Sequence, residues 1–364
     1  MKVGILTFHN AYNYGAILQT YATQELIKGL GHDVEVIDYH NKKIDTIYNG
    51  KKFNFCSLAR YFYRFPLYFI EIFFYRMRRK AYHTFVRKNI RMSYSRYLQD
   101  NTTSIKGYDA ILIGSDQLWN KGITGGFDSV YWGDFVSDTL TRKIAWSICM
   151  NNDAFSCEEK DYIVKHLNNF SAISVREKSL QVFLKELTQK EYPQTLDPTL
   201  LLSRQQWEYL CKPINESNYI AVYAVQNEEE AIQFARQIAK DMKKEIVVLR
   251  ANSKYYFSKE NKEYCGPDEF LSYIRYADFV VTTSFHGTTF SIIFQKQFVC
   301  PIFRKNKRIE SLLSLVGLGE RMIHTSSEVL NLSKIDFNKV EILLGQERAA
   351  SRQFLDSALI NNMN

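Results

Sequence analysis

Short apolar runs alternate with amphipathic stretches along most of this chain, which is the pattern of parallel α/β architecture. In the first half, apolar runs predict buried strands at 3–7, 34–38, 108–114, 143–148 and 171–175. A helix is predicted at 14–29, closed by Gly29 and Gly31. After a less periodic transition at 193–213, a second series predicts strands at 219–225, 245–250, 278–283 and 298–303, with helices at 228–243, 268–276 and 288–295.

The two series predict two doubly wound, Rossmann-like α/β domains that face each other across a cleft. The length of 364 residues also exceeds the size at which a single core usually keeps growing. We expect an N-terminal domain at 1–205, a C-terminal domain at 214–325 and a helical segment at 326–364 that crosses back to the N-terminal domain. The N-terminal domain is expected to carry a helical insertion at about 51–100.

That insertion is the segment whose composition departs most from the rest of the chain. The net charge is +8, and residues 53–96 contribute ten Lys or Arg residues against a single acid, Glu71, among many aromatic residues. Such a basic, aromatic helix could lie on an anionic membrane surface or hold a diphosphate headgroup. It could equally be scaffold with solvated arginines; nucleic-acid binding is the least favoured interpretation.

Cysteine placement and apolar run lengths predict the compartment. The six cysteines are scattered, without a Cys-x-x-Cys pair or a histidine at zinc spacing, so we expect reduced thiols and no metal centre. The N-terminus is predicted to be a strand and not a signal peptide, and no apolar run approaches the roughly 18–20 residues that span a bilayer. We expect a cytoplasmic protein, with peripheral contact at the inner face of the membrane through 53–96.

Polar residues follow several predicted strands, where open α/β sheets bind ligands. The richest such segment is Thr282–Thr289, in which Ser284, His286, Gly287 and Thr288 are predicted to form a loop before a helix. A histidine there could move protons near neutral pH, and a helix start suits a phosphate or carboxylate. The alternative is that His286 caps the helix.

Four other strand ends carry candidate residues, each with a structural alternative. Arg176 could bind an anion through two parallel N–H groups, or it could form an internal salt bridge. Asp116 could act as a base, or it could cap a helix. Asp197-Pro198-Thr199 predicts an Asx-type turn. The remaining candidates for substrate binding are Asn13, Tyr14, Gly15, Ser115, Trp119 and Asn120.

Five segments in one order carry a resemblance. They are Asn13–Gln19, Gly114–Asn120, Ser174–Glu177, Asp197–Thr199 and Ser284–Gly287, and together they resemble the polysaccharide pyruvyl transferase family. No dinucleotide fingerprint, P-loop or Gly-x-Ser-x-Gly pattern competes with this interpretation.

The resemblance implies a fold similar to GT-B glycosyltransferases and transfer of a pyruvate unit from phosphoenolpyruvate onto a sugar as a ketal. It implies no further cofactor. His286 then fits the acid that protonates the enol carbon, Arg176 the anion site, and Asp116 the base. Family members often have arginine two residues before the histidine, where this chain has Ser284. Arg304 is among the residues that could replace it.

Three functional hypotheses follow. The first is a pyruvyltransferase of capsule or exopolysaccharide assembly, with a sugar acceptor linked to a polyprenyl diphosphate or to a nucleotide. The second is a GT-B glycosyltransferase that uses a nucleotide sugar. The third is a non-catalytic protein that binds a membrane surface or nucleic acid through 53–96.

Overall fold

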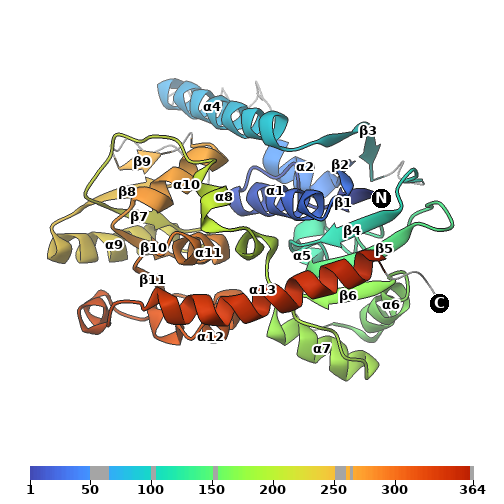
Figure 1. Ribbon diagram of the computed structural model, residues 1–364. Helices are drawn as coiled ribbons and strands as arrows, with labels where there is room; N and C mark the ends of the chain where they lie inside the picture. The colour runs from blue at the N-terminus through green and yellow to red at the C-terminus, as the bar shows by residue number, and fades with distance from the viewer. Residues whose placement is uncertain (50–64, 100–103, 151–154, 251–259, 263–264, 361–364) are drawn as a thin grey trace. The chain divides into compact units, whose positions relative to one another are not determined.

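The computed structural model describes residues 1–49, 65–99, 104–150, 155–250, 260–262 and 265–360 (Figure 1). The contacts divide the chain into two compact units. Unit 1 comprises Met1–Lys51, Asn89–Leu202 and Leu344–Asn364, and unit 2 comprises Lys52–Lys88 and Ser203–Leu343. Most of the predicted helical insertion, assigned above to the N-terminal domain, thus groups with unit 2.

Unit 1 is built on a six-stranded parallel sheet in the order β3-β2-β1-β4-β5-β6, the Rossmann order. Its strands are β1 (Lys2–Leu6), β2 (Asp33–His40), β3 (Met92–Leu98), β4 (Ala110–Gly114), β5 (Arg142–Ile148) and β6 (Ala172–Val175). The main helical segments are α1 (Tyr14–Gly29), α2 (Lys42–Asn49), α5 (Lys121–Thr124), α6 (Cys157–Leu167), α7 (Lys178–Thr188) and η2 (Pro198–Leu201).

Unit 2 repeats the plan, with a parallel sheet in the order β12-β11-β10-β7-β8-β9. Its strands are β7 (Tyr219–Tyr223), β8 (Glu245–Leu249), β9 (Asn261–Lys262), β10 (Phe279–Thr282), β11 (Phe298–Pro301) and β12 (Met322–Ile323). The helical segments are α4 (Phe65–Asn89), α8 (Arg204–Glu208), α9 (Glu228–Met242), α10 (Pro267–Tyr276), α11 (Phe285–Ile293), α12 (Lys307–Leu315), η3 (Gly319–Arg321) and η4 (Ser326–Asn331).

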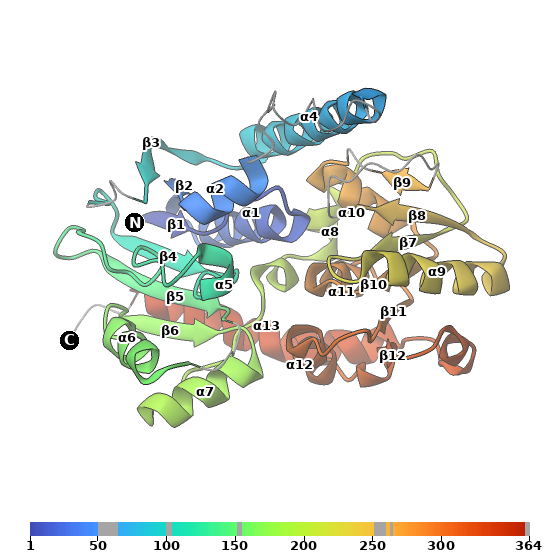
Figure 2. The same ribbon diagram turned by 180° about the vertical axis from the view of Figure 1, so that it is seen from behind.

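The last helix, α13 (Phe337–Ile360), begins in unit 2 and ends in unit 1 (Figure 2). Within unit 1, its Ser351 hydroxyl accepts from the Leu196 backbone N–H at 2.9 Å, and Trp146 stacks on Phe354 with ring centroids 5.8 Å apart. The two parallel sheets confirm the predicted fold class of doubly wound α/β domains. No helix in the described part of the chain is long and apolar enough to cross a bilayer.

Each sheet holds its own apolar core. In unit 1, the indoles of Trp119 and Trp132 stack at 4.2 Å, nearly parallel at 9°, beside the buried face of the sheet. In unit 2, Ile220, Val222 and Val281 lie between the sheet and α9. Because the central strands are buried on both faces, they form continuous apolar runs, and this is why the sequence predicts them well.

Candidate functional site

The carboxyl end of β10 leads directly into α11, and the predicted loop at Ser284–Gly287 is in fact the cap and first turn of that helix. Ser284 is the N-cap, and its hydroxyl accepts from the Gly287 N–H at 3.4 Å. Helix begins at this point because a hydroxyl side chain satisfies one of the first N–H groups, which otherwise lack partners. The helix therefore starts three residues before the predicted position.

His286 occupies the second position of α11 and is largely buried, with 7% of its surface exposed. Its ring stands edge-on to Phe285, with centroids 5.2 Å apart. The helix N-terminus contributes a partial positive charge at this position. Imidazole and helix dipole are thus brought together where charge on an anionic ligand would be stabilised.

Gly287 and Thr288 have packing roles in the same turn. A Cβ on Gly287 would lie 2.1 Å from the Thr282 hydroxyl oxygen. The Thr288 hydroxyl donates to the Ser284 carbonyl at 3.0 Å and lies 3.2 Å from Cys300 Sγ. These contacts explain both residues through the fit of α11 against its sheet, and the anion-binding role predicted for them stays a prediction.

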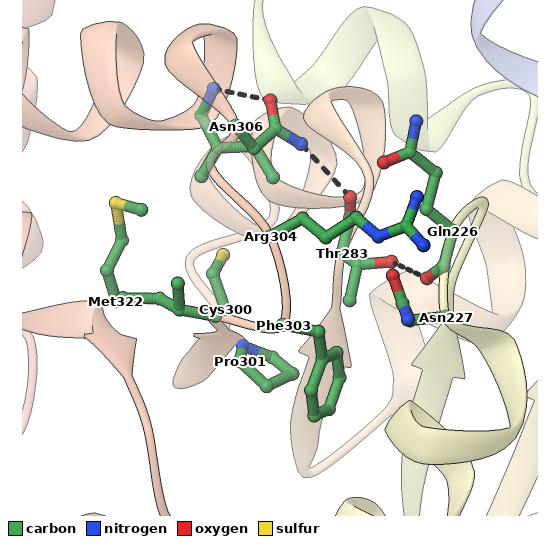
Figure 3. Close-up of a pocket in the computed structure, with 11 residues that line it drawn as sticks. Gln226, Asn227, Thr283, Cys300, Pro301, Phe303, Arg304, Asn306 and Met322 are labelled. Atoms are coloured by element: carbon green, nitrogen blue, oxygen red, sulfur yellow. Dashed lines mark hydrogen bonds between the residues drawn. The ribbon is translucent and has the colours of Figure 1, made fainter.

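A pocket opens beside this helix start, at the carboxyl ends of β10 and β11 (Figure 3). Its polar rim includes Arg304, Gln226, Asn227 and Thr283, and its apolar floor includes Pro301. The rim is held in place by hydrogen bonds from the Thr283 hydroxyl to the Gln226 carbonyl at 2.9 Å and from the Asn306 amide to the Thr283 carbonyl at 3.4 Å. Arg304 is exposed at this rim and can meet an anionic ligand.

In unit 1, Arg176 is engaged in an internal ion pair. Its side chain is 2% exposed, and Nη1 donates to Asp197 Oδ2 at 2.7 Å and to the Ser115 carbonyl at 3.1 Å. Asp197 in turn accepts from the Thr199 N–H at 3.0 Å and from its hydroxyl at 2.6 Å. This arrangement is the salt-bridge alternative considered from the sequence; anion binding by Arg176 stays a prediction.

The other predicted residues of unit 1 are accounted for largely by local structure. Asn13 caps α1 by accepting from the Ala16 N–H at 3.3 Å, and Asn120 caps α5 by accepting from the Gly122 N–H at 3.0 Å. Trp119 is a core residue whose indole N–H donates to the Tyr131 carbonyl at 2.9 Å. The other predicted residues of this set, Tyr14, Gly15 and Ser115, are buried. Their substrate contacts stay predictions.

Asp116 is half-buried, as Asn13 is. Its Oδ1 accepts from the adjacent Gln117 N–H at 2.8 Å. The second carboxylate oxygen gives it the acceptor that a general base needs. The role of Asp116 as a base stays a prediction.

A second polar cluster lies at the carboxyl ends of β1 and β2, and the sequence analysis did not select its residues. His9 Nε2 and His40 Nε2 each lie 2.9 Å from the same atom, Asp38 Oδ1. Hydrogen bonds from the His40 ring to the Asp38 and Asp45 carboxylates raise the pKa of His40 to about 9. Burial alone would raise the pKa of Asp38, but hydrogen bonds from His40, His9 and Arg96 outweigh it and hold that pKa far below its usual range.

The family model for polysaccharide pyruvyl transferase matches residues 13–300. This chain belongs to the polysaccharide pyruvyl transferase family. Membership makes it an enzyme of the transferase class, and the matched range includes α1, the Arg176 pair and the first turn of α11. A sequence search of curated proteins found no match.

Several solved structures resemble this chain at low sequence identity. A putative UDP-N-acetylglucosamine 2-epimerase from Listeria monocytogenes has a TM-score of 0.52 and 11% identity, covering 98% of this chain and 95% of its own. UDP-GlcNAc 2-epimerase from Methanocaldococcus jannaschii has a TM-score of 0.48 and 10% identity, covering 100% and 94%. The glycosyltransferase SnogD from Streptomyces nogalater has a TM-score of 0.43 and 11% identity, covering 98% and 97%.

Ser284 occupies the position, two residues before His286, at which family members often have arginine. The serine side chain closes the helix cap, so it cannot offer a cation to a ligand. Arg304 is the cationic residue among those that line the pocket described above. The pocket lined by Thr283, the residue that precedes Ser284, therefore contains a candidate substitute for the missing charge.

Proposed function

We propose that this protein transfers a pyruvate unit from phosphoenolpyruvate onto a sugar as a ketal, in the biosynthesis of a cell-surface polysaccharide such as a capsule. The observation that carries the proposal is the placement of His286 in the first turn of α11, within the range matched by the pyruvyl transferase family. The nearby pocket with Arg304 at its rim supports an anionic donor.

The reaction defines what the site must supply. Two sugar hydroxyl oxygens form bonds to carbon 2 of the enolpyruvyl group, and the bond from that carbon to the phosphate oxygen breaks. The two hydroxyls lose two protons. One is balanced by the proton that converts the methylene carbon to a methyl group, and the other leaves with inorganic phosphate. The site therefore needs an acid, a base and cations for two anionic groups.

The described residues can fill these roles. His286 is the proposed acid, because an imidazole can donate a proton near neutral pH. Arg304 is the proposed anion contact, because a guanidinium binds carboxylate or phosphate through two parallel N–H groups. Asp116 is the proposed base for a sugar hydroxyl. His286 and Arg304 belong to unit 2, and Asp116 belongs to unit 1.

The acceptor is proposed to be a sugar carried on a polyprenyl diphosphate, and α4 supports this part of the proposal. Arg76, Lys80 and Arg87 are exposed and are spaced so that they lie on one face of the helix. Phe73 and Met77 are exposed beside them, at 58% and 40%. A helix that combines cations with exposed apolar side chains suits an anionic membrane surface.

The opposite face of α4 corrects one detail of the sequence analysis. Arg78 is one of the ten cations counted in 53–96, but it is buried, with its guanidinium carbon 5.5 Å from the centre of the Tyr82 ring. Tyr82 and Phe85 continue this buried face. Arg76, Lys80 and Arg87, on the face of α4 away from Arg78, are therefore the cations proposed to meet the membrane.

The proposal is tested by incubating the protein with phosphoenolpyruvate and lipid-linked or soluble glycosides that carry neighbouring hydroxyls. We expect an acceptor mass gain equal to one pyruvate ketal and an equal amount of released phosphate. The matched control is His286→Gln, which should release little phosphate. A mass gain of a hexose with a nucleotide sugar, and none with phosphoenolpyruvate, would overturn the proposal in favour of a glycosyltransferase.

A further inference from the structure

The cluster at the ends of β1 and β2 brings two imidazole nitrogens, from His9 and His40, close to one carboxylate oxygen of Asp38. His9 Nδ1 lies 3.3 Å from the Thr7 carbonyl oxygen, and His40 Nδ1 lies 2.9 Å from Asp45 Oδ2. Oxygens of these kinds accept hydrogen bonds, so a neutral ring can keep its proton on Nδ1 and donate it to one of them. Each neutral ring then presents an Nε2 lone pair to the same oxygen, Asp38 Oδ1.

Three lone-pair donors facing one another repel unless positive charge lies among them. Two additional protons would supply it, and so would one metal ion. Among the residues that the structure describes, His9, Asp38 and His40 place one ligand atom each within 4.8 Å of one another. We propose that these three side chains bind a divalent transition metal ion of the zinc class.

The spacing of the ligand atoms fits a metal. Ligand atoms about 2.1 Å from a metal ion are about 3.0 Å apart at right angles and about 3.4 Å apart at tetrahedral angles. Both nitrogen-to-oxygen distances in the cluster are 2.9 Å. Two imidazoles and one carboxylate on one face of an ion leave further positions for water or for an oxygen of a bound ligand.

The groups behind the ligands also fit. Metal-bound histidines usually donate their other ring N–H to a carboxylate or a backbone carbonyl, as His40 does to Asp45 and His9 to Thr7. Asn10 Nδ2 donates to Asp45 Oδ1 at 2.6 Å, and Arg96 Nε donates to Asp38 Oδ2 at 2.9 Å. With neutral imidazoles, the two carboxylates and Arg96 leave one net negative charge, which favours a dication.

The three ligand side chains are largely buried, but two of them are still partly exposed to solvent. The side chains of His9, Asp38 and His40 are 4%, 18% and 14% exposed. An ion can therefore enter from solvent and still be held by ligands that neighbouring strands fix in place. The inference is independent of the proposed donor, since the site lies wholly within unit 1.

The first experiment measures metal content and affinity. The full-length protein is stripped with a chelator, given Zn²⁺ and freed of excess metal, and the zinc per chain is determined. We expect about one ion per chain in wild type, and an affinity reduced at least about 100-fold in His9→Ala and His40→Ala. The matched control is His166→Ala, because His166 is a buried histidine of the same unit outside the cluster. It should bind zinc like wild type.

A second pair of measurements guards against variants that fail to fold. Asp45→Asn keeps all three ligands and should weaken zinc binding by about 10- to 100-fold. Wild type loaded with Co²⁺ should show two strongly shifted, exchangeable imidazole N–H proton resonances, one from each Nδ1. Substoichiometric zinc in wild type, equal affinity in the His9 variant, or absence of those resonances would each overturn the proposal and leave a proton-shared network.

Discussion

Arg176 Nη1 donates to Asp197 Oδ2 at 2.7 Å in a pair whose side chains are almost wholly enclosed. Removal of one partner from a buried pair leaves an uncompensated charge, which costs about 3–5 kcal/mol. We therefore expect Arg176→Ala and Asp197→Ala each to lower the free energy of unfolding by that amount, measured by urea denaturation.

The exposed pair between Arg91 and Asp33 supplies the control for this prediction, since it lies in the same unit. Arg91→Ala should change the free energy of unfolding by less than about 1 kcal/mol. If Arg176→Ala were as stable as Arg91→Ala but bound phosphoenolpyruvate poorly, Arg176 would be an anion-binding residue and not a structural one.

Gly287→Ala should destabilise the protein because there is no room for a side chain. Its Cβ would meet the buried Thr282 hydroxyl at 2.1 Å and Tyr223 Cδ1 at 3.1 Å. Overpacking of this kind costs about 1–3 kcal/mol. Thermal unfolding of Gly287→Ala should show a lower Tm, whereas Gly319→Ala, with no atom within 4 Å of the added carbon, should match wild type. Equal melting of both variants would contradict this account.

The sequence predicts the central strands and α1 well, because strands buried on both faces form unbroken apolar runs. It misses β9 and β12, each of which has two residues and lies at a sheet edge. It also misses β3, since the pattern of Met92–Leu98 follows the basic helical segment and carries little apolar signal. Edge strands are identified by pairing partners that a linear pattern does not contain.

The candidate site shows the same limit. His286 is recognisable because its motif is local, but His9 and Asp38 are separated by 29 positions and meet only because β1 pairs with β2. The available signal was polar residues at the ends of two predicted strands. Arg176 shows the reverse case: its position suggests a ligand contact, yet Asp197, which lies 21 residues later, already neutralises it.

His286→Gln should retain the fold and lose most of the turnover. Glutamine keeps a polar side chain of similar size but cannot donate a proton as an acid, and a general acid typically contributes about 100- to 10,000-fold. The measurement is phosphate release at saturating phosphoenolpyruvate, with thermal unfolding as a check on folding. His324→Gln, at an exposed histidine of the same unit, should be unaffected. Turnover near that of wild type in His286→Gln would assign the imidazole a packing role.

Arg304→Ala should chiefly raise the KM for phosphoenolpyruvate. A hydrogen bond to a charged group contributes about 1.5–3 kcal/mol, which corresponds to a rise of roughly 10- to 150-fold. Arg304→Lys should recover only part of the loss, because lysine keeps the charge without the two-pronged geometry. Lys305→Ala is the control, since this neighbour is exposed and does not line the pocket. An unchanged KM in Arg304→Ala would remove Arg304 from the donor site.

Charge reversal on α4 tests membrane docking. Arg76→Glu, Lys80→Glu and Arg87→Glu together change the exposed basic face and leave the buried Arg78 intact. Each Lys or Arg near an anionic leaflet contributes about 1 kcal/mol to binding, so the triple variant should bind vesicles of anionic lipid at least about 100-fold more weakly at low salt.

The control for this prediction reverses three exposed lysines elsewhere in unit 2, with the same change of net charge: Lys240, Lys334 and Lys339. It should bind vesicles nearly as well as wild type, because general charge does not replace a local basic face. Activity on a short water-soluble acceptor should persist in both variants, since neither set includes the residues proposed for the chemistry. If the two variants lost vesicle binding equally, α4 would be scaffold, and a lipid-linked acceptor would have to be brought to the enzyme in another way.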